Sequence, residues 1–456
     1  MPSNGSAADG KTVARKLADA VKPGITHAEL PQNRIGPKGA ASLARALRAE
    51  ASSSITILNL RDNRLGADGV AVLSQALKTN TVIQALNLWR NHLGPEGGCS
   101  VAEAVKHTSS LQTLDLGDNG IGAEGATALA AALKDNCSVS TLLLWRNHLG
   151  PAGGVALAQA LMLNRTVTTL DLRGNRMGDE GAVAVGLAIK TAGVLAKINI
   201  GSNAIGREGA VALADALLNN RSVVNLNVRD NYMGDDGSCE LAKALMRNGT
   251  VTAANLGDNR IGVKGAMALS EALCRNGALE SVNFRDNYLG DEGAKGLAEA
   301  FKSSKTLATV DIGFNAIGDE GVQALAAALV TSRSIRSLNL RHNRILAPGA
   351  LALAEALKTN SSVSNLCLGD NRVGDEGAAN LAAALEVFRC LQPAPPAPLP
   401  RAPPRPHLLG RPAQRPPPAL LARRSTLQSR HSTFGAMASA TKARARWRGR
   451  SGRTTP

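Results

Sequence analysis

The residues of this sequence best suited to binding are two tryptophans, each followed by an arginine. Trp89-Arg90 and Trp145-Arg146 both occur in the phrase WRNHLGP, in a chain where only 2% of the residues are aromatic. A tryptophan exposed beside an arginine is typical of hot spots in protein–protein interfaces. The two phrases therefore predict a surface that binds a protein, although duplication of a two-repeat block would also explain the repetition.

Other chemistries find little support in the residue types. The recurring glycine pairs do not form the GxxxxGK[ST] pattern of a phosphate loop, and no C-x-x-C pair suggests zinc or redox chemistry. Asp-Glu pairs such as Asp179-Glu180 stand where helices are expected to begin, so we interpret them as caps and solubilising charge. No Ser/His/Asp or Cys/His set stands out among seven histidines. We expect no enzyme, no cofactor and no metal site.

The tryptophans belong to an internal repeat that dominates the chain. An asparagine in the pattern L-x-L-x-x-N recurs with a constant period of about 28 residues, and a degenerate copy of the unit precedes these with Asn33, which gives thirteen units. The recurring residues are Asn63, Asn91, Asn119, Asn147, Asn175, Asn203, Asn231, Asn259, Asn287, Asn315, Asn343 and Asn371. We interpret them as a structural ladder whose side chains bond backbone groups of neighbouring repeats.

Each unit reads as one short strand, one turn and one helix. The segment L-x-x-L-x-L alternates as a strand with one buried face, and A-x-x-L-A-x-A-L has helical spacing. One such unit cannot bury its own apolar side, so the units must stack, with a parallel sheet inside and helices outside. Helices are wider than strands, about 10 Å against about 4.8 Å, and the stack should therefore curve around the sheet.

The full pattern L-x-x-L-x-L-x-x-N-x-[IL]-G-x-x-G-A-x-x-L-A-x-A-L resembles the ribonuclease-inhibitor type of leucine-rich repeat. The resemblance covers about residues 25–391 and implies an α/β solenoid, a right-handed βα horseshoe of about 13 repeats of about 28 residues. The same family includes the repeat regions of NACHT-type receptors and of Ran GTPase-activating proteins. It implies a binding role without choosing the partner.

The inner, concave side should carry the binding residues. With the repeated asparagine counted as the ninth position, positions three, five and seven face inward and position eight lies at the rim. The candidate partner-binding residues are Trp89, Arg90, Trp145, Arg146, Arg173, Arg229, Asp230, Arg285, Asp286 and Arg341. The tryptophans are two strands apart, so we expect about 10 Å between their side chains. The alternative is that the Arg and Asp rows only pair with each other.

Charge divides the chain into parts. The segment after residue 386 contains 14 Lys and Arg and no Asp or Glu, so most of the net charge of +16 belongs to a tail. Positions three, five, seven and eight together hold eight positive and nine negative side chains, which is no phosphate-tracking groove. We predict an N-terminal cap segment (1–24), a repeat domain (25–391) and a disordered Pro/Arg-rich tail (392–456). The tail is either a genuine arm, with weak affinity for nucleic acid or anionic lipid, or a mis-spliced or frame-shifted reading.

The most economical function is a non-catalytic scaffold that binds a protein on its concave face. One alternative is a GTPase activator resembling the Ran-specific leucine-rich-repeat class, whose partner would be a small GTPase. The other is a ligand-sensing repeat region resembling that of NACHT-type innate receptors. Without an apolar run of about 18 residues or a signal-peptide pattern, we expect no transmembrane segment and a cytoplasmic protein, with the nucleus as a second possibility.

Overall fold

The computed structural model describes residues 24–48 and 54–391. The predicted N-terminal segment, apart from Gly24, and the predicted tail therefore lie outside the described residues. Within them, strands and helices alternate strictly along the chain.

The strands are His27–Glu29 (β1), Ile57–Asn59 (β2), Ala85–Asn87 (β3), Thr113–Asp115 (β4), Thr141–Leu143 (β5), Thr169–Asp171 (β6), Lys197–Asn199 (β7), Asn225–Asn227 (β8), Ala253–Asn255 (β9), Ser281–Asn283 (β10), Thr309–Asp311 (β11), Ser337–Asn339 (β12) and Asn365–Cys367 (β13). The helices are Gly36–Arg48 (α2), Gly66–Leu77 (α3), Gly94–His107 (α4), Gly122–Asp135 (α5), Gly150–Leu163 (α6), Gly178–Ala192 (α7), Arg207–Asn219 (α8), Gly234–Arg247 (α9), Val263–Arg275 (α10), Gly290–Ser303 (α11), Asp319–Thr331 (α12), Ala347–Thr359 (α13) and Gly374–Leu391 (α14).

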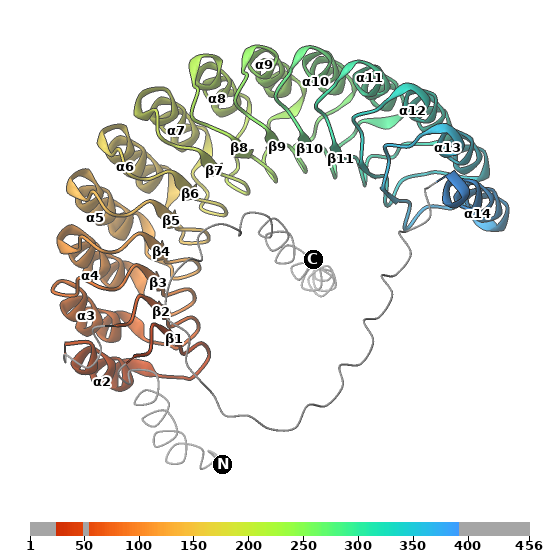
Figure 1. Cartoon of the computed structure of the whole chain (residues 1–456). Coiled ribbons are helices and arrows are strands. Elements are labelled where there is room, and N and C mark those ends of the chain that lie inside the picture. Colours follow the sequence, from red (N-terminus) through yellow and green to blue (C-terminus); the bar gives the residue numbers. More distant parts are fainter. Residues whose placement is uncertain (1–23, 49–53, 392–456) are drawn as a thin grey trace, which may run out of the picture. The chain divides into compact units, whose positions relative to one another are not determined.

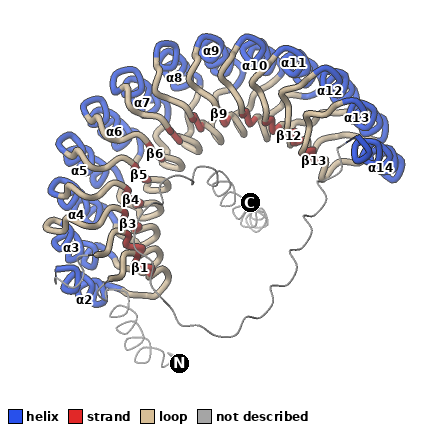
Figure 2. The backbone as a smooth tube through the Cα atoms, viewed as in Figure 1, coloured by secondary structure: helices blue, strands red, loops and turns tan. Residues whose placement is uncertain are grey.

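All thirteen described strands form one parallel sheet in sequence order, from β1 to β13. Equivalent residues pair directly, as Leu58 does with Leu86, because the repeat length is constant. The strands line the inner side of the curved array and the helices its outer side (Figures 1 and 2). The predicted solenoid of thirteen strand–helix repeats is confirmed.

One aliphatic core runs between the sheet and the helices. The apolar residues at positions four and six of the strand segment, most often leucine, point to the helices, as buried Leu58 and Leu60 do. Alanine and leucine from the helices close this layer, and Phe284 and Phe301 are its largest fully buried side chains. Each repeat buries its apolar side against the neighbouring repeats, and small aliphatic side chains are therefore enough to fill the core without many aromatic residues.

The recurring asparagines connect consecutive repeats by side-chain hydrogen bonds. The Asn203 side chain donates through Nδ2 to the carbonyls of Ile200 in its own repeat and Leu172 in the preceding one, at 2.9 and 3.0 Å. Its Oδ1 accepts from the backbone N–H of Asn175 at 2.9 Å. Every donor and acceptor of this buried amide bonds a backbone group, so the asparagine at position nine has a structural role. The exception is Asn259, whose buried Oδ1 has no hydrogen-bond partner among the described residues.

A second row of asparagines closes the other edge of the array, where the helices end. Asn136, for example, donates to the carbonyl of Val105 in the preceding repeat and accepts from the N–H groups of Ser138 and Val139. Asn164, Asn220, Asn248, Asn276 and Asn360 make equivalent bonds. Both edges of the solenoid are therefore pinned by side-chain amides.

The turns before the helices take two forms, and an aspartate of the preceding repeat selects between them. Most of these turns place their glycine in the left-handed region, as at Gly290 with φ +58°. Before α12, Asp291 of the preceding helix accepts from the N–H groups of Gly318 and Gly321 at 2.7 and 3.0 Å, and Gly318 is extended with φ −99°.

Three further helices are capped in the same way from the preceding repeat: α8 by Asp179, α10 by Asp235 and α13 by Asp319. The α13 turn has Leu346 where the other repeats have glycine, and its φ is −105°. A side chain is tolerated there because the cap keeps the backbone out of the left-handed region. These four aspartates are thus caps, as predicted, but for the next helix.

Candidate functional site

The concave surface is built from strand positions three, five and seven, whose side chains point away from the helices. In strand after strand the central residue is buried and its two neighbours are partly exposed. Position seven stands two residues after the end of the strand, and position eight forms the adjoining rim. Positions three and five are mostly Thr, Ser, Asn or Asp, so large side chains on this surface are confined to a few places.

The two tryptophan rings are in contact. Their centroids lie 5.2 Å apart and the ring planes are inclined at 55°. The separation expected from strand spacing, about 10 Å, is wrong, because the Trp145 side chain lies across the intervening strand. That strand has Gly117 at the same position, and a Cβ atom there would lie 2.2 Å from the Trp145 ring. Gly117 is buried beneath the ring, and only glycine leaves this space.

Two arginines flank the aromatic pair. The Arg61 guanidinium carbon lies 3.7 Å from the Trp89 ring centroid, and that of Arg173 lies 5.3 Å from the Trp145 centroid. Arg61, Trp89, Trp145 and Arg173, which we call the tryptophan cluster, thus form a continuous row along β2–β6. Both tryptophans are half-buried rather than fully exposed as expected. Cation–π contacts of this kind hold the rings in fixed orientation.

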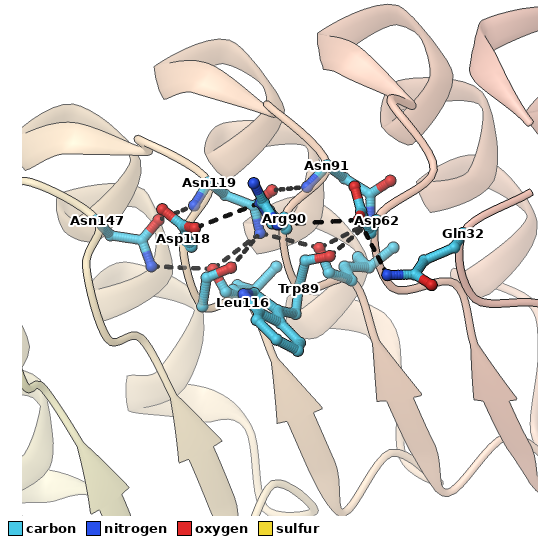
Figure 3. Close-up of polar contacts among 11 residues, drawn as sticks. Gln32, Asp62, Trp89, Arg90, Asn91, Leu116, Asp118, Asn119 and Asn147 are labelled. Carbon is cyan, nitrogen blue, oxygen red and sulfur yellow. Dashed lines mark hydrogen bonds and ion pairs between the residues drawn. The ribbon is translucent and has the colours of Figure 1, made fainter. Parts of the chain in front are cut away.

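The rim residues beside the cluster form a polar row. Asp62 lies between Gln32, whose amide is 3.4 Å away, and Arg90, at 3.9 Å, and Arg90 also lies 3.8 Å from Asp118 (Figure 3). All described position-eight residues have positive φ. Aspartate is common in this conformation, so the backbone explains much of the Asp row. Arg146 is exposed and packs its stem against Gly174.

Position five has a structural role that sequence reasoning missed. Its Asn or Asp Oδ1 accepts a hydrogen bond from the N–H of position seven, as Asn87 does from Trp89 at 2.9 Å. Ten strands share this bond: those of Asn59, Asn87, Asp115, Asp171, Asn199, Asn227, Asn255, Asn283, Asp311 and Asn339. The recurrence of Asn and Asp at this position was the available signal. The bond fixes the backbone that presents Trp89, whereas the strand before Trp145 has Leu143 at this position.

Two of these carboxyls, Asp115 and Asp171, belong to strands β4 and β6, which the tryptophan cluster spans. Burial raises the pKa of Asp115, and the charge of Asp171 raises it further, whereas the Gly117 N–H opposes the shift. Burial also raises the pKa of Asp171, against the attraction of Arg173, whose guanidinium is 3.5 Å away. Between the two aspartates position five is Leu143. Position five of β4–β6 therefore combines an apolar side chain with two partly desolvated carboxyls.

The remaining candidate residues lie in a second region, along β8–β13. If the Arg and Asp rows only paired with each other, Arg285 would pair with Asp286, but its guanidinium carbon lies 4.3 Å from the Phe314 ring centroid. Phe314 in turn stacks on His342, with centroids 3.9 Å apart and planes 11° from parallel. Arg285 is not held by its neighbouring aspartate because it reaches past Gly313 to the aromatic ring.

Other members of this region behave differently from one another. Arg341 forms an ion pair with Asp370 in the next repeat at 2.6 Å, as the alternative interpretation predicts. This contact lowers the pKa of Asp370, through the hydrogen bond from Arg341 first and its charge second. Arg229 and Asp230 are half-buried, and Asp230 accepts a hydrogen bond from the Ser202 hydroxyl at 2.7 Å. The structure thus separates the predicted site residues into two groups.

Exposed tyrosines on the rim were also missed. Tyr232 and Tyr288 stand at position ten, directly after the repeated asparagine, with 53% and 69% of their surface exposed. The Arg260 guanidinium carbon lies 4.2 Å from the Tyr232 ring centroid. As these are the only two tyrosines of the chain, their shared position in repeats two apart was a visible signal.

Among residues 24–48 and 54–391, no cluster of three or more His, Cys, Asp or Glu side chains is arranged to hold a metal ion. None of the helices in this part of the chain is both long and apolar enough to cross a membrane.

Comparison with known proteins identifies the repeat. The family described as Leucine Rich repeat matches residues 51–74, 107–130, 163–186, 195–214, 248–270, 278–298, 303–326, 331–354 and 359–382. No curated protein matches the chain.

Among solved structures, leiomodin-1 actin-binding site 2 is similar at 21% identity, over 34% of this chain and 91% of that one, with a TM-score of 0.28. The tropomodulin C-terminal domain of Caenorhabditis elegans is similar at 19% identity over 33% and 92% of the chains (TM-score 0.29). A chain of the yeast Rad7 and Elc1 complex is similar at 15% identity over 83% and 86% (TM-score 0.45). The nine matched segments and the regular stack of strand–helix units identify this chain as a leucine-rich-repeat protein.

Proposed function

We propose that this chain is a non-catalytic scaffold that binds a protein partner on its concave surface, with the tryptophan cluster at the centre of the contact. The observation that carries the proposal is the contact of two tryptophan rings over Gly117. The rings lie on the side of the sheet away from the core, so core packing does not require them. Large aromatic side chains beside arginine are the residues that most often dominate binding energy.

The geometry supports this role in a second way. The tryptophans are held by each other, by Arg61 and Arg173, and by the position-five hydrogen bond from the Trp89 N–H. A surface whose large side chains are already ordered loses little conformational entropy when a partner binds. The cluster therefore offers a rigid, partly apolar platform on an otherwise polar surface.

The proposal is tested by capturing partners with the full chain, identifying them by mass spectrometry and measuring the dissociation constant of the purified partner. Trp89→Ala and Trp145→Ala should each weaken binding by about 2 kcal/mol or more, roughly 30-fold in Kd. The matched control is Val183→Ala with Leu187→Ala, two exposed apolar side chains of α7 on the outer face. Binding that survives the double tryptophan variant would contradict the proposal.

The non-catalytic part of the proposal has its own test. The Ran-specific type of GTPase activator would accelerate hydrolysis of GTP by a small GTPase, whereas a scaffold would not. We expect no stimulation by the full chain in a single-turnover assay with a panel of small GTPases. Clear stimulation would contradict the scaffold proposal and support the GTPase-activator alternative. Capture of a ligand that the repeats sense would favour the NACHT-type alternative.

A further inference from the structure

A row of basic side chains borders the tryptophan cluster. Position ten, the residue after each repeated asparagine, contains six arginines, two histidines and no acidic residue along the thirteen repeats. Beside the cluster these are Arg64, His92, His148 and Arg176, all exposed. Arg90 and Arg146 at position eight join them, and we call these six residues the basic rim.

The backbone does not explain why these residues are basic. Arg64, His92, His148 and Arg176 all have φ between 56° and 58°, the left-handed region that favours glycine, asparagine and aspartate. An arginine there has no conformational advantage over asparagine. The charge itself is therefore the property that requires an explanation.

Acidic residues within the chain neutralise only part of this rim. Asp62 and Asp118 both lie within 4 Å of the same arginine, Arg90, at 3.9 and 3.8 Å. Arg64, Arg146 and Arg176 form no ion pair with any other residue that the structure describes. Asp115 and Asp171 are at position five of β4 and β6, where Asp171 lies 3.5 Å from Arg173 and not in an ion pair with the rim. The other acidic groups of these repeats are in the helices, at Asp68, Glu96, Glu103, Glu124, Asp135, Asp179 and Glu180.

The rim and the cluster belong to the same loops, so one partner can touch both. Trp89, Arg90 and His92 lie within four consecutive residues, and Figure 3 shows the Trp89 ring beside the row that contains Arg90. Across β2–β6 the strand spacing of about 4.8 Å gives the rim a length of about 20 Å. This matches an extended segment of about six residues.

We infer that the partner contacts the tryptophan cluster with an acidic protein segment whose carboxylates lie on the basic rim. The inference rests on the proposed function and names the chemistry of its partner. A nucleic acid fits less well, because stacking of bases needs free ring faces. Here Arg61 and Arg173 occupy faces of the two rings, and the rings contact each other. Asp62 and Asp118 would also oppose a continuous phosphate backbone.

The experiment uses the tryptophans as local reporters. The chain has three tryptophans, and the third, Trp447, lies outside the described residues. In a full-length Trp447→Phe variant the emission comes from Trp89 and Trp145 alone. The probe is a 12-residue peptide of Glu, Asp and Leu with a nitroxide quencher, titrated at low and high salt. A peptide with Lys in place of the acids and an oligothymidylate of 12 nucleotides carry the same quencher.

The decisive variant is Arg64→Glu with Arg146→Glu and Arg176→Glu. We expect this variant to raise the half-quenching concentration of the acidic peptide by about tenfold or more. For the parent chain, 0.5 M salt should raise it by a similar factor. The matched control reverses three exposed basic residues of the outer helices, Lys106→Glu, Lys134→Glu and Arg247→Glu. It has the same net charge, so it should leave quenching unchanged, and a melting curve checks the fold of both.

Three results would overturn the inference: equal quenching by the acidic and lysine peptides, an equal effect of the two triple variants, or stronger quenching by the oligothymidylate. A failure of the proposed function looks different. If the double tryptophan variant keeps the full affinity of the captured partner, the site itself is wrong. If partner binding needs the tryptophans but acidic-peptide quenching ignores the rim, only the acidic chemistry is wrong.

Discussion

The two halves of the concave surface use glycine at position seven in the same way but fill the space with different side chains. Near β4, Gly117 makes room for Trp145 to meet Trp89. Near β11, Gly313 lets Arg285 reach the Phe314 ring. A glycine at position seven therefore lets a long side chain reach another repeat: Trp145 reaches Trp89 two repeats away, and Arg285 reaches Phe314 in the next repeat. The identity of the large residue decides whether the surface is aromatic or cationic.

The turns differ between the halves as well. From α2 to α7 every described helix-start glycine has positive φ, whereas α8, α10, α12 and α13 are capped by an aspartate of the preceding repeat. The first half depends on glycine at that turn, and the second half has positions that do not. A constant repeat length thus permits two solutions to the same turn.

The largest expected change in stability comes from the asparagine row. Asn203→Leu should lower the free energy of unfolding by about 1–3 kcal/mol, because buried backbone groups on both sides lose their partner. Asn259→Leu should cost less, since the Oδ1 of Asn259 is already without a partner among the described residues. Urea unfolding of both variants gives the comparison, and equal losses would contradict the difference between the two sites.

The two turn types give the next prediction. Gly290→Leu should destabilise by about 1–2 kcal/mol, since φ there is +58° and a side chain in the left-handed region has that cost. Gly318→Leu should change stability by only about 0.5 kcal/mol, because the aspartate-capped turn already tolerates Leu346. Thermal unfolding measures both. Similar losses at the two glycines would show that the caps do not set the conformation.

A smaller, pH-dependent effect is expected at Asp115. Its pKa is raised above the ordinary 3.8 by burial, so the folded state binds its proton more tightly than the unfolded state does. Stability from this group is therefore lost as pH rises through the folded pKa. Asp115→Asn, which keeps the Oδ1 acceptor, should be more stable than the parent at pH 7. That advantage should shrink as pH falls toward the ordinary pKa of 3.8, and denaturant unfolding across this range would detect it. An advantage that grows on acidification would contradict the sign.

The sequence was sufficient for the architecture because its signal is a strict period. The spacing of the asparagines predicted thirteen repeats, and the alternation of leucines predicted which strand positions are buried; the sheet confirms both. The position of Leu346, by contrast, depends on a cap from Asp319 in another repeat. Periodicity within one unit does not contain that information.

The site was predicted less completely. Backbone spacing gave about 10 Å between the tryptophans, whereas the Trp145 side chain, which lies over a glycine, reduced it to 5.2 Å. Likewise, adjacency in sequence suggested that Arg285 pairs with Asp286, but the arginine stem spans to Phe314 instead. The reach of long side chains along a sheet is decided by the space that neighbouring strands leave, and this space appears only when the strands are side by side.

The proposed binding centre is the pair of contacting tryptophan rings, and not merely the presence of tryptophan. Gly117→Ala tests this most directly, because it removes no aromatic residue but places a Cβ where the Trp145 ring lies. The control is Gly369→Ala, where the nearest atom is 3.7 Å away. In calorimetric titrations with the captured partner, we expect Gly117→Ala to weaken binding by about tenfold or more and Gly369→Ala to leave it unchanged. Equal affinity of the parent chain and Gly117→Ala would contradict the proposal that the ring pair is the binding centre.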